Sequence, residues 1–323
     1  MKAFITGASG FIGSHLARKL LDQKWQVSIL RHERELPGLE ECQVFHGDIR
    51  DPHSLKEMFK GTDVLFHLAA VLGASRIEKK QFFQINAQGT QNVLQSAFET
   101  GVKRVVHCSS AGVFGSVKEN RPVEENHMQS PRDIYDKTKL EGEKIALRFA
   151  EKGENVVVIR PGWVYGPGDQ RTFKLIKAVA SKKFFLVTKG STRQTPVFID
   201  DLIQGILLCA EKAEAGEIYH LAGKEELTVK EITTAIAQES GVRLSQFPLP
   251  VFILKVAAWK LEKSFSLLGK EAPLTLGKLA FFIHPKPLSI QKASTELGYL
   301  PEWDFKTGIA TTVAWYRQNG WLP

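Results

Sequence analysis

The chain is poor in sulfur-containing residues, with three cysteines and three methionines among 323 residues. Cys42, Cys108 and Cys209 are odd in number and lack the spacing of metal ligands, so we expect neither a disulfide framework nor a metal site. Cys108 lies in an apolar run, where a thiol packs as a small hydrophobic side chain. Reduced thiols are typical of the cytoplasm, and we expect a cytoplasmic protein.

Long uncharged apolar segments are also missing, and so are basic stripes with interleaved aromatic residues. The first absence argues against a transmembrane span. Met1 and Lys2 lead directly into an apolar run, so we expect no signal peptide. The net charge is +8, but Lys79–Lys80 and Lys182–Lys183 are isolated pairs, which argues against nucleic-acid binding. Such a basic chain would attract an anionic cofactor or small-molecule substrate.

A glycine-rich turn follows the first apolar run. Residues 6–13 have the sequence TGASGFIG, and apolar residues then recur at three- and four-residue steps, which indicates strand, tight turn and helix. In such a turn Gly7 permits the bend, Gly10 lets a pyrophosphate approach the backbone, and Gly13 lets the helix pack on the strand. The helix N-terminus would then bind the phosphates. These residues predict a dinucleotide site.

A basic residue follows the second predicted strand, residues 25–30. NAD-preferring folds place an acidic residue there for the ribose 2′-hydroxyl, whereas this chain has Arg31, with His32 and Arg34 close by. An arginine can pair with a 2′-phosphate, although a solvated loop cation is the alternative interpretation. The sequence therefore favours NADP over NAD.

The strongest chemical signal is a tyrosine four residues before a lysine. Tyr135 and Lys139 would lie on one face of a helix, with Ser110 twenty-five residues upstream. A nearby positive charge favours the phenolate form of tyrosine, so the pair predicts an acid/base catalyst. The alternation of apolar strands and helical patterns through residue 165 predicts an α/β fold with a doubly wound parallel sheet of the Rossmann type.

In their order and spacing, these motifs resemble those of the extended short-chain dehydrogenase/reductase family, also called the NAD-dependent epimerase/dehydratase family. The similar segments are TGASGFIG at 6–13, GDIRD at 47–51, FHLAA at 66–70, NAQGT at 86–90, CSSAGVFG at 108–115, the Tyr135–Lys139 pair and RPGWVYGPG at 160–168.

The resemblance implies roles for individual residues. Tyr135 would be the general acid/base, Lys139 would lower its pKa and hold the nicotinamide ribose, and Ser110 would bind the reacting oxygen. Ser109 is the alternative to Ser110, but the spacing to Tyr135 favours Ser110. The predicted cofactor contacts are Gly7, Ser9, Gly10, Phe11, Ile12, Arg31, Asp48, Ile49, Leu68, Ala69, Ala70, Asn86, Ser109, Tyr135, Lys139, Pro161 and Val164.

The resemblance also implies two interleaved lobes. Residues 1–165, with about 196–224, would form the nucleotide-binding domain, and residues 166–195 and 225–323 a smaller C-terminal substrate lobe. Dehydratase members of the family carry an Asp-Glu pair directly after the catalytic Ser or Thr. Here Ala111 and Gly112 follow Ser110, so we do not expect dehydration.

The C-terminal half carries conflicting signs of the substrate. Arg193 falls near the position where sugar-nucleotide members place a phosphate- or ribose-binding arginine. Residues 292–301 and 308–316, however, resemble the tails of relatives of dihydroflavonol reductases and 3β-hydroxysteroid dehydrogenases, which act on bulky apolar ketones and alcohols. Local patterns predict a helix at 173–179, a strand at 184–187 and an Asp-capped helix at 200–209.

Residues 251–268 predict an amphipathic helix. Its apolar face would carry Ile253, Leu254, Ala257, Ala258, Leu261, Phe265 and Leu268, opposite Lys255, Lys260, Glu262 and Lys263. A lid over an apolar pocket or simple core packing is the favoured interpretation, and an interfacial membrane helix is the alternative. The apolar run at 279–283 would line the same pocket.

Three functions remain open at this stage. The favoured one is an NADP-linked oxidoreductase that interconverts a ketone and a secondary alcohol. The second is a nucleotide-sugar 4-epimerase, and the third is a non-catalytic NADP-binding sensor, which the Tyr135–Lys139 pair argues against. The resemblance further implies a homodimer built from the helices that carry Asn86 and Tyr135.

Overall fold

The computed structural model describes residues 1–32, 38–73, 77–119, 121–244, 249–267, 272 and 274–322. Arg34 and Leu268, both named above, lie outside these residues.

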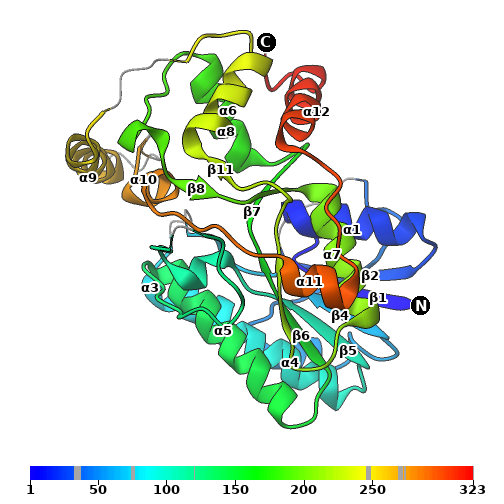
Figure 1. The fold of residues 1–323 in the computed structure, drawn as a ribbon. Helices are drawn as coiled ribbons and strands as arrows, with labels where there is room; N and C mark the ends of the chain where they lie inside the picture. The colour runs from blue at the N-terminus through cyan, green and yellow to red at the C-terminus, as the bar shows by residue number, and fades with distance from the viewer. Residues whose placement is uncertain are drawn as a thin grey trace.

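A parallel seven-stranded sheet forms the base of the molecule (Figure 1). Each neighbouring pair of strands is parallel. The strands lie in the order β10 (Ile218–Leu221), β6 (Val156–Pro161), β5 (Arg104–Cys108), β4 (Val64–His67), β1 (Lys2–Thr6), β2 (Gln26–Arg31) and β3 (Gln43–His46). This order reverses direction at β1, which is the Rossmann arrangement and confirms the predicted fold class.

Helices cover both faces of the sheet, since alternate strand residues point in opposite directions. Ile5 and Phe66 belong to a core shared with α1 (Phe11–Asp22) and α7 (Ile199–Lys212), whereas Phe4 and Leu65 belong to a core shared with α4 (Gly89–Glu99) and α5 (Ile134–Glu151). The remaining elements near the sheet are α2 (Pro52–Leu55), α3 (Lys79–Phe83), the π-helix η1 (Gln84–Gln88), the 3₁₀-helix η2 (Ala111–Phe114) and α11 (Gln291–Leu297).

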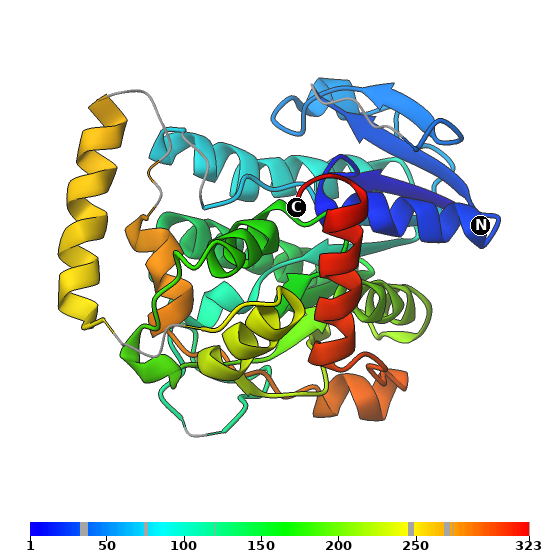
Figure 2. The same ribbon diagram turned by 90° about the horizontal axis from the view of Figure 1, so that it is seen from above.

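A smaller lobe lies over one edge of the sheet (Figures 1 and 2). Its strands β8 (Arg193–Gln194) and β11 (Leu227–Thr228) pair antiparallel, and β7 (Trp163–Tyr165) pairs in parallel with β9 (Pro196–Phe198). Its helical elements are α6 (Gln170–Ala180), η3 (Thr188–Gly190), α8 (Val229–Glu239), α9 (Val251–Leu267), α10 (Leu276–Ile283) and α12 (Phe305–Gln318). None of the helices in the described ranges is long and apolar enough to cross a membrane.

Both helices predicted in the C-terminal half are confirmed, whereas the predicted strand and the predicted Asp cap are not found in the described residues. The helix expected at 173–179 is α6, and the described part of the chain shows the segment 184–187 in one bridge, from Val187 to Leu249. The helix expected at 200–209 begins at Ile199 and has no side-chain cap. The Asp201 carboxylate instead accepts hydrogen bonds from the backbone N–H groups of residues 302 and 303. Its side chain therefore binds a distant segment of the chain and does not cap its own helix.

Candidate active site

The predicted glycine turn is present between β1 and α1. Gly7 has φ +82°, and a Cβ atom there would lie 2.6 Å from the backbone nitrogen of Ala69. A Cβ atom on Gly13 would lie 2.3 Å from the Gly7 carbonyl oxygen, so α1 packs closely on the turn. Gly10 is the N-cap of α1, and no side chain caps this end. The N–H groups of the first helical turn therefore remain for a ligand.

Asn86 connects the end of β4 to α5. Its side-chain amide accepts a hydrogen bond from the Val71 N–H at 2.8 Å and donates to the Val71 carbonyl at 3.1 Å and to the Thr138 hydroxyl at 3.0 Å. Asn86 lies in η1, a π-helical turn, which is a local departure common at functional sites. The segment of Leu68, Ala69 and Ala70 that precedes Val71 is thereby held against the glycine turn.

Ser110 and Tyr135 meet at the C-terminal edge of the sheet. Ser110 is the N-cap of η2, directly after β5, and its hydroxyl accepts a hydrogen bond from the Gly112 N–H at 3.0 Å. Tyr135 lies in the first turn of α5, and the Ser110 side chain is close enough to its hydroxyl to lower the pKa of the phenol. The structure therefore brings the predicted serine and tyrosine together.

The pKa of Tyr135 differs in direction from the sequence-based expectation. Burial raises the pKa of the phenol to about 12, while the charge of Arg171 and the nearby Ser110 side chain lower it less. Lys139, which the sequence predicts to lower this pKa, is not among these influences, and desolvation of the phenolate sets the direction of the shift.

Lys139 follows Tyr135 by one helical turn and is only 3 % exposed. Among the described residues, its ammonium group makes no hydrogen bond, and burial lowers its pKa. Its charge acts on the buried rings of His67 and His107, whose pKa values burial lowers, that of His67 to about 3. The two rings lie 5.3 Å apart, and within the described ranges neither nitrogen of His107 has a hydrogen-bond partner.

Ser109 belongs to a buried ion-pair network that sequence reasoning missed. Its hydroxyl donates to the Glu143 carboxylate at 2.6 Å, and Arg160 donates to the same carboxylate at 2.6 and 2.9 Å. Both charged side chains are 0 % exposed. This network joins the ends of β5 and β6 to α5, so Ser109 supports the strand end and leaves the Tyr135 contact to Ser110.

A second buried carboxylate lies beside the site. Asp136 follows Tyr135, and a Cβ atom on Gly112 would lie 1.9 Å from its Oδ1 atom, so only glycine fits there. Burial raises the pKa of Asp136 to about 6, against the charge of Lys286. The Lys286 ammonium, from the segment after α10, lies 3.9 Å from the Asp136 carboxylate. This contact links the smaller lobe to the start of α5.

The predicted nucleotide contacts lie along the same edge. Arg31 is the last residue of β2, and Asp48 and Ile49 follow β3. The Asp48 carboxylate lies 3.2 Å from the His32 ring and also pairs with Arg50. Burial alone would raise the pKa of Asp48, but the contacts with Arg50 and His32 together lower it. The other predicted contacts also surround this edge: Ser9, Phe11 and Ile12 at the turn and the start of α1, Pro161 at the end of β6, and Val164 in β7.

Arg193 and the aromatic residues lie in the smaller lobe. Arg193 is in β8, where its guanidinium donates to Glu226 at 2.6 Å. Trp163 is in β7, two residues beyond Pro161, and its ring lies 4.9 Å from that of Phe281 in α10. The apolar run of α10 thus reaches the strand that continues from β6, as the lid interpretation requires.

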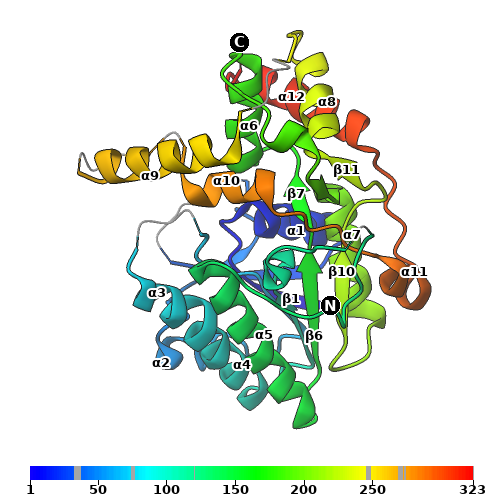
Figure 3. The same cartoon turned by 60° about the vertical axis from the view of Figure 1, so that its left-hand side comes forward.

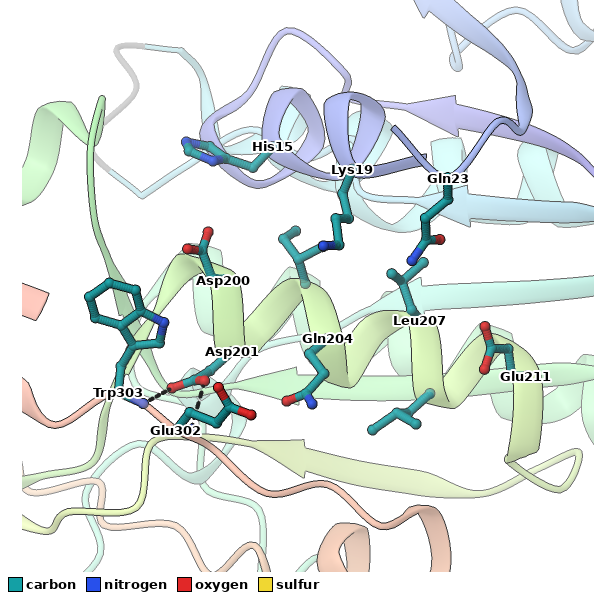
Figure 4. Close-up of a pocket in the computed structure, with 12 residues that line it drawn as sticks. His15, Lys19, Gln23, Asp200, Asp201, Gln204, Leu207, Glu211, Glu302 and Trp303 are labelled. Carbon is teal, nitrogen blue, oxygen red and sulfur yellow. Dashed lines mark hydrogen bonds between the residues drawn. The ribbon is translucent and has the colours of Figure 1, made fainter. Parts of the chain in front are cut away.

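A separate groove of about 400 Å³ lies between α1 and α7 (Figure 4). His15, Lys19 and Gln23 line it from α1, and α7 lines it from the other side. Figure 4 shows the Asp201 carboxylate bonded at its edge to the backbone of residues 302 and 303. Ser110, Tyr135 and Lys139 are not part of this groove, so it lies apart from the candidate catalytic residues.

Comparisons with known proteins agree with this geometry. The family model for the NAD dependent epimerase/dehydratase family matches residues 3–222. The 4-hydroxy-2-methyl-3-oxo-4-farnesyl-3,4-dihydroquinoline-1-oxide ketoreductase of Stigmatella aurantiaca is 28 % identical over 317 residues, which cover 96 % of this chain and 95 % of the relative. The 3 beta-hydroxysteroid dehydrogenase/Delta 5-->4-isomerase of Mycobacterium tuberculosis (strain CDC 1551 / Oshkosh) is 28 % identical over 336 residues, 98 % of this chain and 90 % of the relative.

A similar solved structure is that of a DesIV double mutant, a dTDP-glucose 4,6-dehydratase from Streptomyces venezuelae with NAD and DAU bound. It has a TM-score of 0.80 and 29 % identity, and the match covers 99 % of this chain and 98 % of that one.

Proposed function

The chain belongs to the NAD-dependent epimerase/dehydratase family, and from that premise we propose that it is an NAD(P)-dependent oxidoreductase that interconverts a ketone and a secondary alcohol. The observation that carries the proposal is that Ser110, at the N-cap of η2, lies beside Tyr135 at the C-terminal edge of the sheet, one helical turn from the buried Lys139. In doubly wound folds this edge is where ligands bind.

The residues around this edge fit a dinucleotide. The glycine turn leaves no room for side chains between Gly7, Gly13 and Ala69, and the N-terminus of α1 has no side-chain cap, as pyrophosphate binding requires. The buried Lys139 ammonium makes no hydrogen bond within the described ranges, and ribose hydroxyls would supply acceptors for it. When bound, the nicotinamide donates or accepts a hydride.

Ser110 and Tyr135 would act on the oxygen of the substrate. With a pKa of about 12, the Tyr135 phenol is protonated near neutral pH and supports donation of a proton to a carbonyl oxygen. Ser110 lies beside the Tyr135 hydroxyl, so a carbonyl oxygen that contacts both hydroxyls would be held where its negative charge develops. The Gly112 N–H fixes the Ser110 hydroxyl in position.

The surroundings of the site favour an apolar substrate. Trp163 in β7, just beyond Pro161, and Phe281 in α10 bring two aromatic rings together there, and aromatic rings suit a large apolar ketone. Both curated relatives described above have names that denote a ketoreductase or a steroid dehydrogenase. The nucleotide-sugar alternative relied on Arg193, whose guanidinium is engaged by Glu226.

Substitution of Tyr135 tests the proposal. Tyr135→Phe should lower turnover of apolar ketones by about 10²–10⁴-fold, since it removes the proton donor, and should leave cofactor affinity near the wild-type value. Nicotinamide absorbance measures turnover, and protein fluorescence measures cofactor binding. Tyr219→Phe is the matched control. Tyr219 lies in β10, away from Ser110, and its hydroxyl donates a hydrogen bond to Glu296 in α11. Unchanged turnover in Tyr135→Phe would remove Tyr135 from the mechanism.

The same assays separate the alternatives. A 4-epimerase would convert a nucleotide sugar with no net change in NAD(P)H, whereas the proposed enzyme consumes or produces it with a ketone or an alcohol. A non-catalytic sensor would bind the dinucleotide and stay inactive over a broad panel of both substrate classes.

We also propose that NADP is the preferred cofactor. Arg31 ends β2, at the position where this fold reads the ribose 2′ substituent. Arg31→Asp should shift the ratio of NADPH to NADH affinity toward NADH by about 10–100-fold, because hydrogen bonds to charged groups contribute about 1.5–3 kcal/mol. Fluorescence titration with both cofactors measures the ratio. Tighter binding of NADH by the wild type would contradict this preference.

A further inference from the structure

The outer face of α9 exposes large apolar side chains. Phe252 is 76 % exposed, Ile253 54 %, Val256 38 % and Trp259 51 %. In the described residues, the inner face packs through Leu254, Ala257, Ala258, Leu261 and Phe265, which are buried or half-buried. Figure 3 shows α9 at the periphery of the smaller lobe, with α10 beside it. Ile253, which the sequence analysis placed on one apolar face with Leu254 and Ala258, therefore belongs to the exposed side of the helix.

The exposed residues form one continuous surface with lysines. Phe252, Val256, Trp259 and Lys263 follow one another at four-, three- and four-residue steps, so they lie in a row along the helix. The Lys263 ammonium lies 5.1 Å from the centre of the Trp259 ring. Lys255 and Lys260 are also exposed and flank this row on either side. We call Phe252, Ile253, Val256, Trp259 and the three lysines the α9 outer face.

The charge of the α9 outer face is of one sign. Glu262 is the single acidic residue in the sequence of α9, and its carboxylate accepts a hydrogen bond from the Leu276 N–H at 2.8 Å, so it points to the start of α10. Positive charge continues toward the start of α5, since Arg132, Lys286 and Lys255 all act on His284. Burial, together with these charges, lowers the pKa of His284 to about 4.

We propose that the α9 outer face docks the protein on a lipid bilayer with anionic headgroups. Aromatic and aliphatic side chains would enter the boundary between headgroups and acyl chains, and the lysine stems would lie along it with their ammonium groups among the phosphates. Trp and Phe with neighbouring lysines are the side chains that such interfacial helices use. The surface contains none of Ser110, Tyr135 and Lys139, so the proposal stands independently of the proposed function.

A second copy of the chain fits this surface less well. A two-fold contact places the same patch on itself, which would bring three lysines against three lysines with no acid between them. The homodimer that the family resemblance predicts would use the helices that carry Asn86 and Tyr135, which lie below α9 in Figure 3 and are separate from the α9 outer face.

Vesicle flotation of the full chain tests the proposal. The wild type should float with vesicles of phosphatidylcholine and phosphatidylglycerol, should float at least about tenfold less with phosphatidylcholine alone, and should be released by ~1 M salt, where the Debye length falls to about 3 Å. Failure of the wild type to float with the anionic vesicles would overturn the proposal without any variant.

Two variants locate the surface. Phe252→Ser with Trp259→Ser should reduce flotation at least about tenfold, because it removes the largest apolar groups. Lys255→Glu with Lys260→Glu should reduce flotation by more than about fivefold for each substituted lysine, because each cation near an anionic surface contributes about 1 kcal/mol. Met128→Ser with Leu300→Ser is the matched control, which removes exposed apolar side chains elsewhere.

The outcomes distinguish the membrane from a second copy. All variants change exposed side chains, so circular dichroism and sedimentation should match the wild type. Equal flotation of the α9 variants and the control would overturn the proposal. So would a change from dimer to monomer in the α9 variants with flotation retained, which would assign the surface to self-association.

Discussion

Helices α5 and α9 reverse the usual distribution of side chains in opposite ways. On α5 the charged residues Asp136, Lys139 and Glu143 are buried, whereas on α9 the apolar residues Phe252 and Trp259 are exposed. Buried charges and exposed apolar groups are the informative exceptions to burial rules, because each is unfavourable unless something compensates for it. On α5, other side chains of the protein compensate for the buried charges. On α9, a bilayer would compensate for the exposed apolar side chains.

The compensation on α5 is specific for each charge. Arg160 and Ser109 satisfy Glu143, and Lys286 neutralises Asp136 from the smaller lobe. The ammonium of Lys139 is left without a hydrogen bond in the described part of the chain, which is the position where a ligand would complete the network. The difference between the two helices therefore predicts large effects of substitutions on α5 partners and small effects on the outside of α9.

The largest effect is expected from breaking the buried pair. Arg160→Met leaves the Glu143 carboxylate without its cation in a site that is 0 % exposed, and should lower the free energy of unfolding by about 3–5 kcal/mol. Urea unfolding measures this change. Arg148→Met, on the helix that carries Glu143, is the control, because Arg148 is exposed and 3.9 Å from Glu141, and such pairs contribute ~0–1 kcal/mol. Equal losses in both variants would contradict the importance of the buried pair.

A smaller effect on stability is expected when the pH is lowered, because the buried histidines are held neutral in the folded protein. Burial lowers the pKa of His107 well below its ordinary value, so the folded protein holds it neutral while the unfolded chain binds a proton below about pH 6.5. Each such histidine makes stability fall by up to about 1.4 kcal/mol per pH unit as the pH drops below 6.5. His107→Leu should remove one such contribution.

Unfolding of wild type and His107→Leu at a series of pH values from 7.5 down to 5 measures the difference in slope. At pH 7.5 both states of the wild type hold the ring neutral, so that point is the internal control. Parallel pH profiles for the two proteins would show that His107 is protonated in the folded state.

The half of the chain that forms the seven-stranded sheet could be predicted in some detail because its signals are local. Gly7 has φ +82°, Gly13 packs on the same turn, and Tyr135 and Lys139 are four residues apart on one helix. The Glu143–Arg160 pair and the contact of Asp136 with Lys286 could not be predicted, since nothing local identifies partners that lie on different elements. The raised pKa of Tyr135 depends on burial, which spacing does not reveal.

The smaller lobe was predicted less well for a related reason. Residues 251–267 do form a helix, and the periodicity separates two faces, but periodicity does not show how much of each face the fold covers. Ile253 was placed on the same apolar face as the half-buried Leu254 although it is exposed, and the exposed Phe252 and Trp259 were not included in that face. The segment 184–187 forms the bridge from Val187 to Leu249 in the described part of the chain, and such pairing depends on a distant segment that local patterns do not reveal.

The smallest effect is expected on the outside of α9. Phe252→Ser should change the free energy of unfolding in lipid-free solution by no more than about 0.5 kcal/mol, because the side chain is exposed in the folded protein. Ala258→Ser is the matched change on the inner face, where the side chain is 0 % exposed and an unpaired hydroxyl costs about 1–3 kcal/mol. Urea unfolding of both variants compares the two faces. A loss of stability in Phe252→Ser as large as that in Ala258→Ser would mean that the fold itself covers Phe252, and would place α9 with the packed helices instead of with the docking surfaces.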